Sequence, residues 1–165
     1  MSQPYEGATP EQLEHHLVRH FLEIHAMFRN QLAVMLDYVA ELIDGEQQLG
    51  GSETRMRIQA LIRAGAQYSQ LLHFHHHGET SIMFPALEEE GLDTAVVARL
   101  NREHDEIAAL IDQFSRAIRD FSTIEPQVMN NDLRRLAEAL QAHLAYEETH
   151  VCPLLTRWSH FPGFH

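Results

Sequence analysis

Apolar side chains recur every three to four residues along most of the chain, which predicts long amphipathic α-helices. The first helix is expected from Thr9 to about Ile43. Thr9 can cap its start, Pro10 suits the first helical position, and Gln12 completes a capping box. Residues 44–45, Asp-Gly, should end it. Its inward stripe consists of Val18, Leu22, His25, Leu32, Leu36 and Val39.

A second helix is expected over residues 52–89, after a loop that contains the glycines 50–51. Pro85 removes a backbone donor, so it should bend or break this helix near its end. Gly91 suits the position just after a helix C-terminus. The inward stripe of this helix consists of Leu61, Gly65, Tyr68, Leu72, His75, Glu79 and Ile82.

Two further helices are expected over residues 93–121 and about 125–158, the latter opening at a Glu-Pro pair. Short connections between long helices favour antiparallel neighbours, so the pattern predicts an all-α, up-down-up-down four-helix bundle. We expect a single domain over residues 1–165, with the bundle over about 9–158 and an irregular tail. The two inward stripes consist of Leu100, His104, Ile107, Ile111 and Phe114, and of Leu133, Leu136, Leu140, His143, Glu147 and Leu154.

The net charge and composition of the chain restrict the kinds of molecule that it can bind. A formal net charge of −12 argues against binding to nucleic acid or to anionic membranes, which would repel the chain. No segment has the length of apolar sequence that a membrane span needs, and residues 1–6 lack the character of a signal peptide. The single cysteine, Cys152, cannot form an internal disulfide; it suits a reducing, cytoplasmic environment and is expected as a small buried side chain.

The chain contains thirteen histidines, and two of them stand in an unusual spacing. His75 precedes Glu79 by four residues, and His143 precedes Glu147 by the same step. On a helix this step places an imidazole and a carboxylate on one face. A buried carboxylate needs a partner, so these two His/Glu pairs on inward stripes indicate bound cations. Because each of the two carboxylates could bridge a pair of ions, two ions are expected. The alternative is that both pairs form ordinary hydrogen bonds on the surface of a differently rotated bundle.

The types of the candidate ligand side chains restrict which metal can be bound. A lone cysteine cannot build a thiolate zinc site, and mixed imidazole and carboxylate ligands suit iron, manganese or zinc. Two glutamates shared between helices favour a carboxylate-bridged pair of irons. A ferritin-like site would need two Glu-x-x-His steps, and the one such step on an inward stripe runs from Glu147 to His150.

Over residues 17–155 the chain resembles the hemerythrin-like (HHE cation-binding) family. The resemblance rests on an ordered set of short motifs with specific spacing. They are His25-Ala-Met-Phe-Arg29, His75-His76-x-x-Glu79 followed by Met83-Phe84-Pro85-Ala86-Leu87, Glu103-His104-Asp-Glu-Ile107, and His143-Leu-x-x-Glu147-Glu148 before Pro153-Leu154-Leu155.

The resemblance implies a non-haem di-iron centre, with two iron ions joined by an oxo or hydroxo bridge inside a four-helix bundle. It implies that Glu79 and Glu147 bridge the irons. Oxygen-carrying hemerythrins have a further histidine where this chain has Ala108, and an aspartate five residues after the last ligand histidine instead of Glu147. By position, the ligands implied are His25, His75, Glu79, His104, His143 and Glu147.

The implied site has four histidine ligands, whereas oxygen-carrying hemerythrins have five, so one coordination position is left open. Tyr68, His76 and Tyr146 are candidates to fill it as additional ligands, although each is more readily explained by packing or by a hydrogen bond to a ligand. The remaining histidines considered are expected to be mostly peripheral: His15, His16, His20, His73 and His77.

An open position suits a small-molecule substrate or ligand. The resemblance favours reaction with hydrogen peroxide, either catalase-like or as a nitric oxide peroxidase. A second class is binding or sensing of dioxygen, nitric oxide or iron without turnover. A third is a metal-free bundle that acts through its surface.

Overall fold

The computed structural model describes residues 7–45, 51–120 and 125–163, and within them every regular element is a helix. The expectations for residues 1–6, Gly50, Phe121 and the end of the tail lie outside the described residues. None of the helices described is long and apolar enough to cross a membrane. The elements are α1 (Pro10–Leu13), α2 (His16–Gly45), α3 (Gly51–Gly78), the π-helix η1 (Glu79–Met83), α4 (Phe84–Glu89), α5 (Thr94–Arg119) and α6 (Pro126–Leu155).

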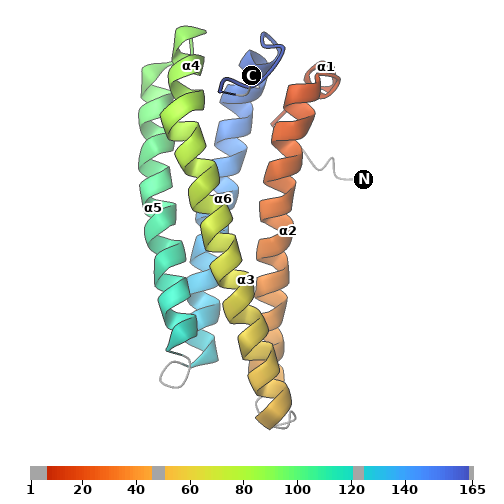
Figure 1. Cartoon of the computed structure of the whole chain (residues 1–165), viewed down its shortest axis with the longest axis vertical. Coiled ribbons are helices and arrows are strands. Elements are labelled where there is room, and N and C mark those ends of the chain that lie inside the picture. The colour runs from red at the N-terminus through yellow and green to blue at the C-terminus, as the bar shows by residue number, and fades with distance from the viewer. Residues whose placement is uncertain (1–6, 46–50, 121–124, 164–165) are drawn as a thin grey trace.

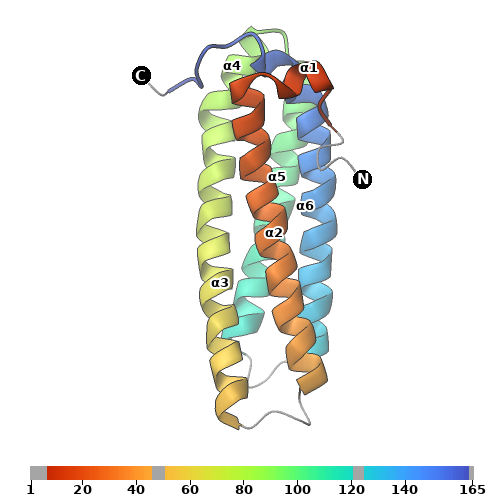
Figure 2. The same cartoon turned by 90° about the vertical axis from the view of Figure 1, so that its right-hand side faces the viewer.

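The four long helices lie side by side (Figures 1 and 2). Helix α2 packs against α3 and α6, and α5 packs against the same two neighbours. Each long helix therefore has two long neighbours, and its inward stripe faces the space that all four enclose. The helical class expected from the sequence is confirmed.

The expected first helix is divided in two. Its capping box is confirmed, because the Thr9 side chain accepts from the Gln12 N–H while Gln12 accepts from the Thr9 N–H. The chain then breaks before α2. A ring nitrogen of His15 accepts from the Leu17 N–H at 3.3 Å, and Arg19 donates to the Glu14 carbonyl at 2.8 Å. These side chains satisfy backbone groups that a continuous helix would have paired, so the break is stable.

The expected bend near Pro85 takes the form of a π-helix. Residues 79–83 form η1, and the Phe84 N–H donates to the Glu79 carbonyl, five residues back. One extra residue per turn shifts the inward face, because the stripe no longer advances by a constant angle. Ile82, expected inside, is consequently 49% exposed, whereas Met83 and Phe84 are buried. The prediction for Ile82 was wrong for this reason.

Gly91 ends α4 as expected. Its φ of 105° lies in the left-handed region. The Leu92 N–H donates to the Leu87 carbonyl and the Gly91 N–H to the Glu88 carbonyl, which is the Schellman pattern. The later helices also agree with expectation: Asp93 caps α5, while α6 ends at Leu155, slightly before the position expected.

The core consists of two apolar clusters separated by a polar layer. One contains Phe28, Leu72, Ile107 and Leu140, and the other contains Phe21, Phe84, Leu100, Val151 and Cys152. Along α2, the chain passes from the second cluster to the first at His25. Because α3, η1 and α4 follow one another without a gap, the described residues form four helical rods: α2, α3–η1–α4, α5 and α6. In each of the other three rods, residues of one cluster are likewise separated from residues of the other by the inward histidines and glutamates. Most of the expected stripe is buried, and Leu36 and Leu154 are half-buried.

We predict that Gly91→Ala destabilises the protein. A residue with a Cβ in the left-handed conformation costs about 1–2 kcal/mol, and among the described residues beyond its chain neighbours no atom lies within 4 Å of the added carbon to change that cost. Gly51→Ala is the matched control, because Gly51 is helical with equally open space. Urea denaturation should show a lower free energy of unfolding for the first variant and an unchanged or higher one for the second. Equal effects would contradict the backbone argument.

Candidate metal centre

Seven histidine and glutamate side chains meet in the polar layer between the two apolar clusters. Six of them are the residues expected from the sequence, and His76 is the seventh. Every one is buried except His75, whose side chain keeps 13% of its surface exposed. They come from all four helical rods: His25 from α2, His75 and His76 from α3, Glu79 from η1, His104 from α5, and His143 and Glu147 from α6.

These side chains form two groups, each able to hold a cation. In both groups the candidate ligand atoms lie within 4.8 Å of one another. Glu79 belongs to both groups. The first group is His76, Glu79, His104 and His143, and the second is His25, His75, Glu79 and Glu147.

The two carboxylates lie between the groups. Glu79 Oε1 is 3.2 Å from His75 Nε2, in the second group, and 3.4 Å from His104 Nε2, in the first. Glu147 presents one oxygen to each side: Oε2 is 3.1 Å from His143 Nε2, and Oε1 is 3.8 Å from His25 Nε2. Each carboxylate thus lies close to histidines of both groups.

His76 adds a fifth imidazole to the four expected. Consecutive residues on a helix point about 100° apart, and α3 lies between α2 and α5. His75 therefore faces α2, with its ring 5.5 Å from that of His25. His76 faces the opposite neighbour, with its ring stacked on His104 at 3.9 Å and 5.3 Å from His143. The sequence alone favoured a supporting role for His76, whereas the structure places it among the candidate ligands.

Nine buried nitrogen and oxygen atoms of these side chains have no hydrogen-bond partner in the part of the chain that the structure describes. They are one Nε2 from each of the five histidines and both oxygens of Glu79 and Glu147. Leaving one buried polar group unpaired costs about 1–3 kcal/mol. The close approach of Glu147 to His143 and of Glu79 to His75 offsets part of this cost, and the remainder destabilises the cluster by itself. All nine atoms are good ligands for a borderline cation and they converge from different helices. The residues therefore fit bound metal.

The outward nitrogen of His25 is held by an acidic partner. His25 Nδ1 lies 2.9 Å from Glu148 Oε1, and Arg29 binds both oxygens of Glu148, at 2.7 and 3.2 Å. Burial alone would raise the pKa of Glu148, but these hydrogen bonds lower it, so the carboxylate is ionised. An ionised carboxylate only accepts, so His25 carries its proton on Nδ1 and leaves the Nε2 lone pair facing the centre.

His143 and His104 are oriented in the same way by other partners. His143 Nδ1 donates to Glu103 Oε1 at 3.2 Å, and Arg99 holds the other oxygen of Glu103. His104 Nδ1 lies 2.9 Å from the Thr80 hydroxyl, which donates to Asn101. The sequence pattern did not predict these supporting roles. The available signals were the adjacency of Glu103 and His104 and the step of four residues from His25 to Arg29.

The two tyrosines proposed as extra ligands make other contacts. The Tyr68 hydroxyl donates to the Phe28 carbonyl at 3.1 Å, and burial raises the pKa of this phenol. Tyr146 stacks against the Arg99 guanidinium, 3.7 Å from its ring centre. The histidines expected to be peripheral, namely His15, His16, His20, His73 and His77, are outside both groups.

Burial and mutual repulsion shift the protonation of the metal-free centre. Burial lowers the pKa of His75 to about 3, with the His25 ring as a further cause, and lowers that of His104 to about 4. Burial and the neighbouring Glu147 raise the pKa of Glu79. For Glu147 the effect of burial is outweighed by interactions with Glu79 and His143, so its pKa is lowered. Burial thus keeps His75, His76 and His104 neutral, in the form that binds metal. For His143 burial also lowers the pKa, but hydrogen bonds to Glu147 and Glu103 outweigh it, so the pKa is raised.

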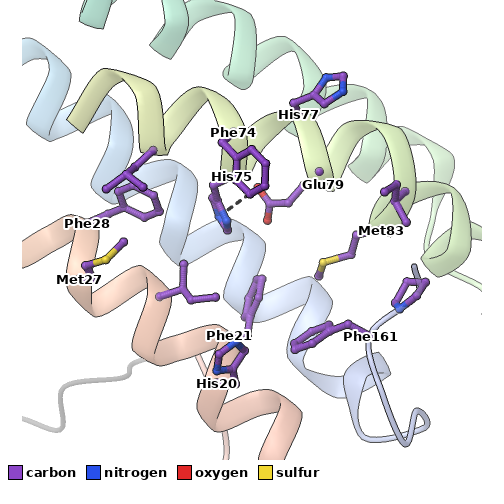
Figure 3. Close-up of a pocket in the computed structure, with 15 residues that line it drawn as sticks. His20, Phe21, Met27, Phe28, Phe74, His75, His77, Glu79, Met83 and Phe161 are labelled. Atoms are coloured by element: carbon purple, nitrogen blue, oxygen red, sulfur yellow. Dashed lines mark ion pairs between the residues drawn. The ribbon is translucent and has the colours of Figure 1, made fainter. Parts of the chain in front are cut away.

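An apolar pocket of about 460 Å³ reaches the centre from outside. It opens between α2 and the α3–η1 rod, and residues 161–162 close one side of it. Figure 3 shows His75 and Glu79 pointing toward its inner end, with Phe21, Phe28 and Met83 around them. Because His75 is also the most exposed of the five imidazoles, the pocket offers a small molecule a route to the second group.

Comparison with known proteins gives one match. The family model for the hemerythrin HHE cation binding domain matches residues 16–155, which include all seven side chains of the centre. No curated protein and no solved structure matches the chain.

We predict that the metal-free protein loses stability as the pH falls from about 6.5 to 4. In the folded chain burial lowers the pKa of His75, His76 and His104, whereas in the unfolded chain these rings titrate near 6.5. The unfolded state therefore binds more protons in this range, and acid favours it. Glu79 and His143, whose pKa values are raised in the folded chain, oppose this effect in part. Urea denaturation in chelator at several pH values tests this, and a free energy of unfolding that rises on acidification would contradict it.

We predict that Glu148→Leu weakens metal binding by about 10–100-fold, because His25 loses the acceptor that orients it. Glu148→Gln keeps an acceptor of the same shape and should lose less. Competition with a chromophoric chelator measures both affinities. Glu106→Leu, at an exposed position of α5, is the control for the loss of a carboxylate. Wild-type affinity in Glu148→Leu would show that the hydrogen bond to His25 does not support the centre.

Proposed function

Because the chain belongs to the hemerythrin HHE cation-binding domain family, we propose that it is a non-haem di-iron protein. The observation that carries this proposal is the convergence of nine unpartnered, buried nitrogen and oxygen atoms among the described residues. The proposed ligands are the seven side chains that contribute these atoms: His25, His75, His76, Glu79, His104, His143 and Glu147.

The division of the ligands into two groups supports two ions. A single cation in one group would leave the imidazoles of the other without a partner, and their desolvation would stay uncompensated. With two ions, three imidazoles serve one position and two serve the other. Glu79 and Glu147 then bridge both positions, which agrees with the distances from their oxygens to histidines of each group.

The donor set allows iron, and membership of the hemerythrin family favours iron over the other metals it allows. Five neutral imidazoles and two carboxylates suit iron, manganese or zinc, and thiolate is absent because Cys152 lies buried in the neighbouring apolar cluster. The position with two imidazoles has fewer protein ligands. It is also the position that the apolar pocket reaches, so an exogenous molecule can bind there.

We propose hydrogen peroxide as the substrate. A bound iron pair would supply two-electron exchange, so that two molecules of peroxide yield one dioxygen and two waters, or one peroxide oxidises two molecules of nitric oxide to two of nitrous acid. The chain itself holds the bridging carboxylates between the helices. It also fixes protons on the Nδ1 atoms of His25 and His143, away from the ions. The apolar walls of the pocket limit water at the inner end.

Reversible binding of dioxygen or nitric oxide without turnover is the second candidate. The observation that favours it is His76, which completes a set of five imidazoles and removes the vacancy expected at Ala108. A slow, reversible spectral change with dioxygen and negligible consumption of peroxide would support this function over the first.

We also propose that the chain is a single domain built as an up-down-up-down four-helix bundle. In Figure 1 the colours of consecutive long helices run in opposite directions along the long axis. The contacts of α2 and α5 with both α3 and α6 agree with this arrangement. The shared centre, to which every helical rod contributes, supports a single unit.

We predict about two irons per chain in protein expressed with iron and purified without chelator, measured by elemental analysis. Glu79→Gln and His143→Leu should reduce iron to less than half of that and lower peroxide turnover by about 100-fold or more, because each removes a ligand. His73→Gln is the matched control: His73 is exposed on α3 and pairs with Asp112, so its loss should change neither quantity.

Three results would contradict the proposal. Full peroxide turnover in an iron-free variant would place the chemistry elsewhere. Zinc in place of iron would exclude redox chemistry at the centre. A folded protein that binds no metal, with unchanged thermal stability after chelation, would favour a bundle that acts through its surface.

A further inference from the structure

The apolar pocket beside the centre is far larger than the small molecules considered so far. Its volume is about 460 Å³, whereas a water molecule occupies about 30 Å³ of liquid, and peroxide, dioxygen and nitric oxide are only slightly larger. Pockets of about 300–1,000 Å³ are typical for organic ligands of drug size. The volume therefore suits an organic molecule that occupies the pocket alongside a small oxidant.

The walls of the pocket are aromatic and sulfur-containing. Four phenylalanines and two methionines line it, from three separate segments of the chain: Phe21, Met27, Phe28, Phe74, Met83 and Phe161. Flat aromatic molecules pack well against phenylalanine rings and thioether sulfurs. Phe161 belongs to the segment after α6, which is tied down by hydrogen bonds from Arg157 to Glu90 and from His16 to Ser159. This segment is therefore held in place as one wall of the pocket.

The mouth of the pocket exposes apolar surface. Phe74 is 79% exposed and Ile82 is 49% exposed, and both line the pocket. An apolar ligand that fills the pocket would cover both side chains and remove their apolar surface from water. A charged ligand would lose hydration against these walls without compensation.

Polar groups occur at the two ends of the pocket. His75 and Glu79 lie at the inner end, and the exposed His20 and His77 lie at the outer side. A ligand that matches this arrangement has an apolar aromatic body with a hydroxyl at each end. We propose that the pocket binds an apolar hydroquinone, which serves as the reducing substrate for peroxide at the neighbouring centre. The role as reductant rests on the proposed function, whereas the binding rests on the pocket alone.

The reaction is a balanced two-electron transfer. The hydroquinone loses the hydrogens of its two hydroxyl groups and becomes a quinone. The O–O bond of one peroxide breaks, and its two oxygens take up the two electrons and two protons to form two waters. No further oxidant or reductant is needed, and the products are one quinone and two waters for each peroxide.

Binding is tested first, in the absence of peroxide and air, with 1,4-dihydroxynaphthalene as the probe and the iron-loaded full chain. Fluorescence titration should show one saturable site, and a naphthalene disulfonate of similar size should not bind. Gly78→Trp is the blocking variant, because Gly78 lines the pocket and no atom lies within 4 Å of an added Cβ. It should weaken binding at least tenfold, whereas Gly78→Ala should bind within twofold of the wild type.

A second pair of variants acts at the mouth and should not disturb folding. Phe74→Ser removes an exposed wall of the pocket and should weaken binding several-fold. Met56→Ser removes another highly exposed apolar side chain of the same helix, one that does not line the pocket, and should have no effect. Iron content is measured for every variant, so that a change at the centre is recognised. Absence of saturable binding, or wild-type affinity in both Gly78→Trp and Phe74→Ser, would overturn the proposed site.

The reaction is tested second, by following naphthoquinone formation after addition of peroxide. One quinone per peroxide in the wild type, and loss of quinone formation in Gly78→Trp with unchanged iron, would support the role as reductant. Saturable binding with evolution of dioxygen and no quinone would overturn that role while leaving catalase-like chemistry intact. Consumption of no peroxide by any iron-loaded variant would overturn the proposed function and the role as reductant, and the titration would still decide the binding site.

Discussion

Two carboxylates and five imidazoles face one another in the interior, and their inward atoms find no hydrogen-bond partner among the described residues. This is the constraint on which the remaining structure depends. It divides the apolar core into two clusters and requires an acceptor for each outward-facing nitrogen of His25, His104 and His143. It also requires charged residues such as Arg29 to hold those acceptors. The free energy that this arrangement lacks without a cation is what a bound cation supplies.

The helices were largely predictable because each carries a regular stripe with a period of 3.6 residues and recognisable ends. The exceptions arise where the backbone follows a tertiary contact instead of a local preference. The break before α2 depends on where the side chains of His15 and Arg19 settle. The π-helix before Pro85 shifts the stripe by one residue, and a constant angular step therefore placed Ile82 on the wrong face.

Most of the candidate ligands could be predicted from the sequence, but the residues that support them could not. A step of four residues on an inward stripe fixes the direction of both side chains, and the structure brings together all six residues that this reasoning and the family resemblance indicated. His76 was undervalued because a stripe describes one face, whereas α3 contacts a different long helix on each side. The roles of Glu148 and Thr80 depend on which element packs opposite, and that information is not local to their segments.

The adjacency of His75 and His76 has a consequence for how the centre is loaded. The two rings project from neighbouring residues of a single helix into different groups, and Glu79, one turn further, belongs to both. A rotation of α3 that tightens one group necessarily moves a ring of the other. In the proposed two-ion centre, an ion bound by one group would fix the orientation of α3 and so order the ligands of the other group. Cooperative loading is therefore expected of the proposed two-ion centre, with few chains that carry a single ion.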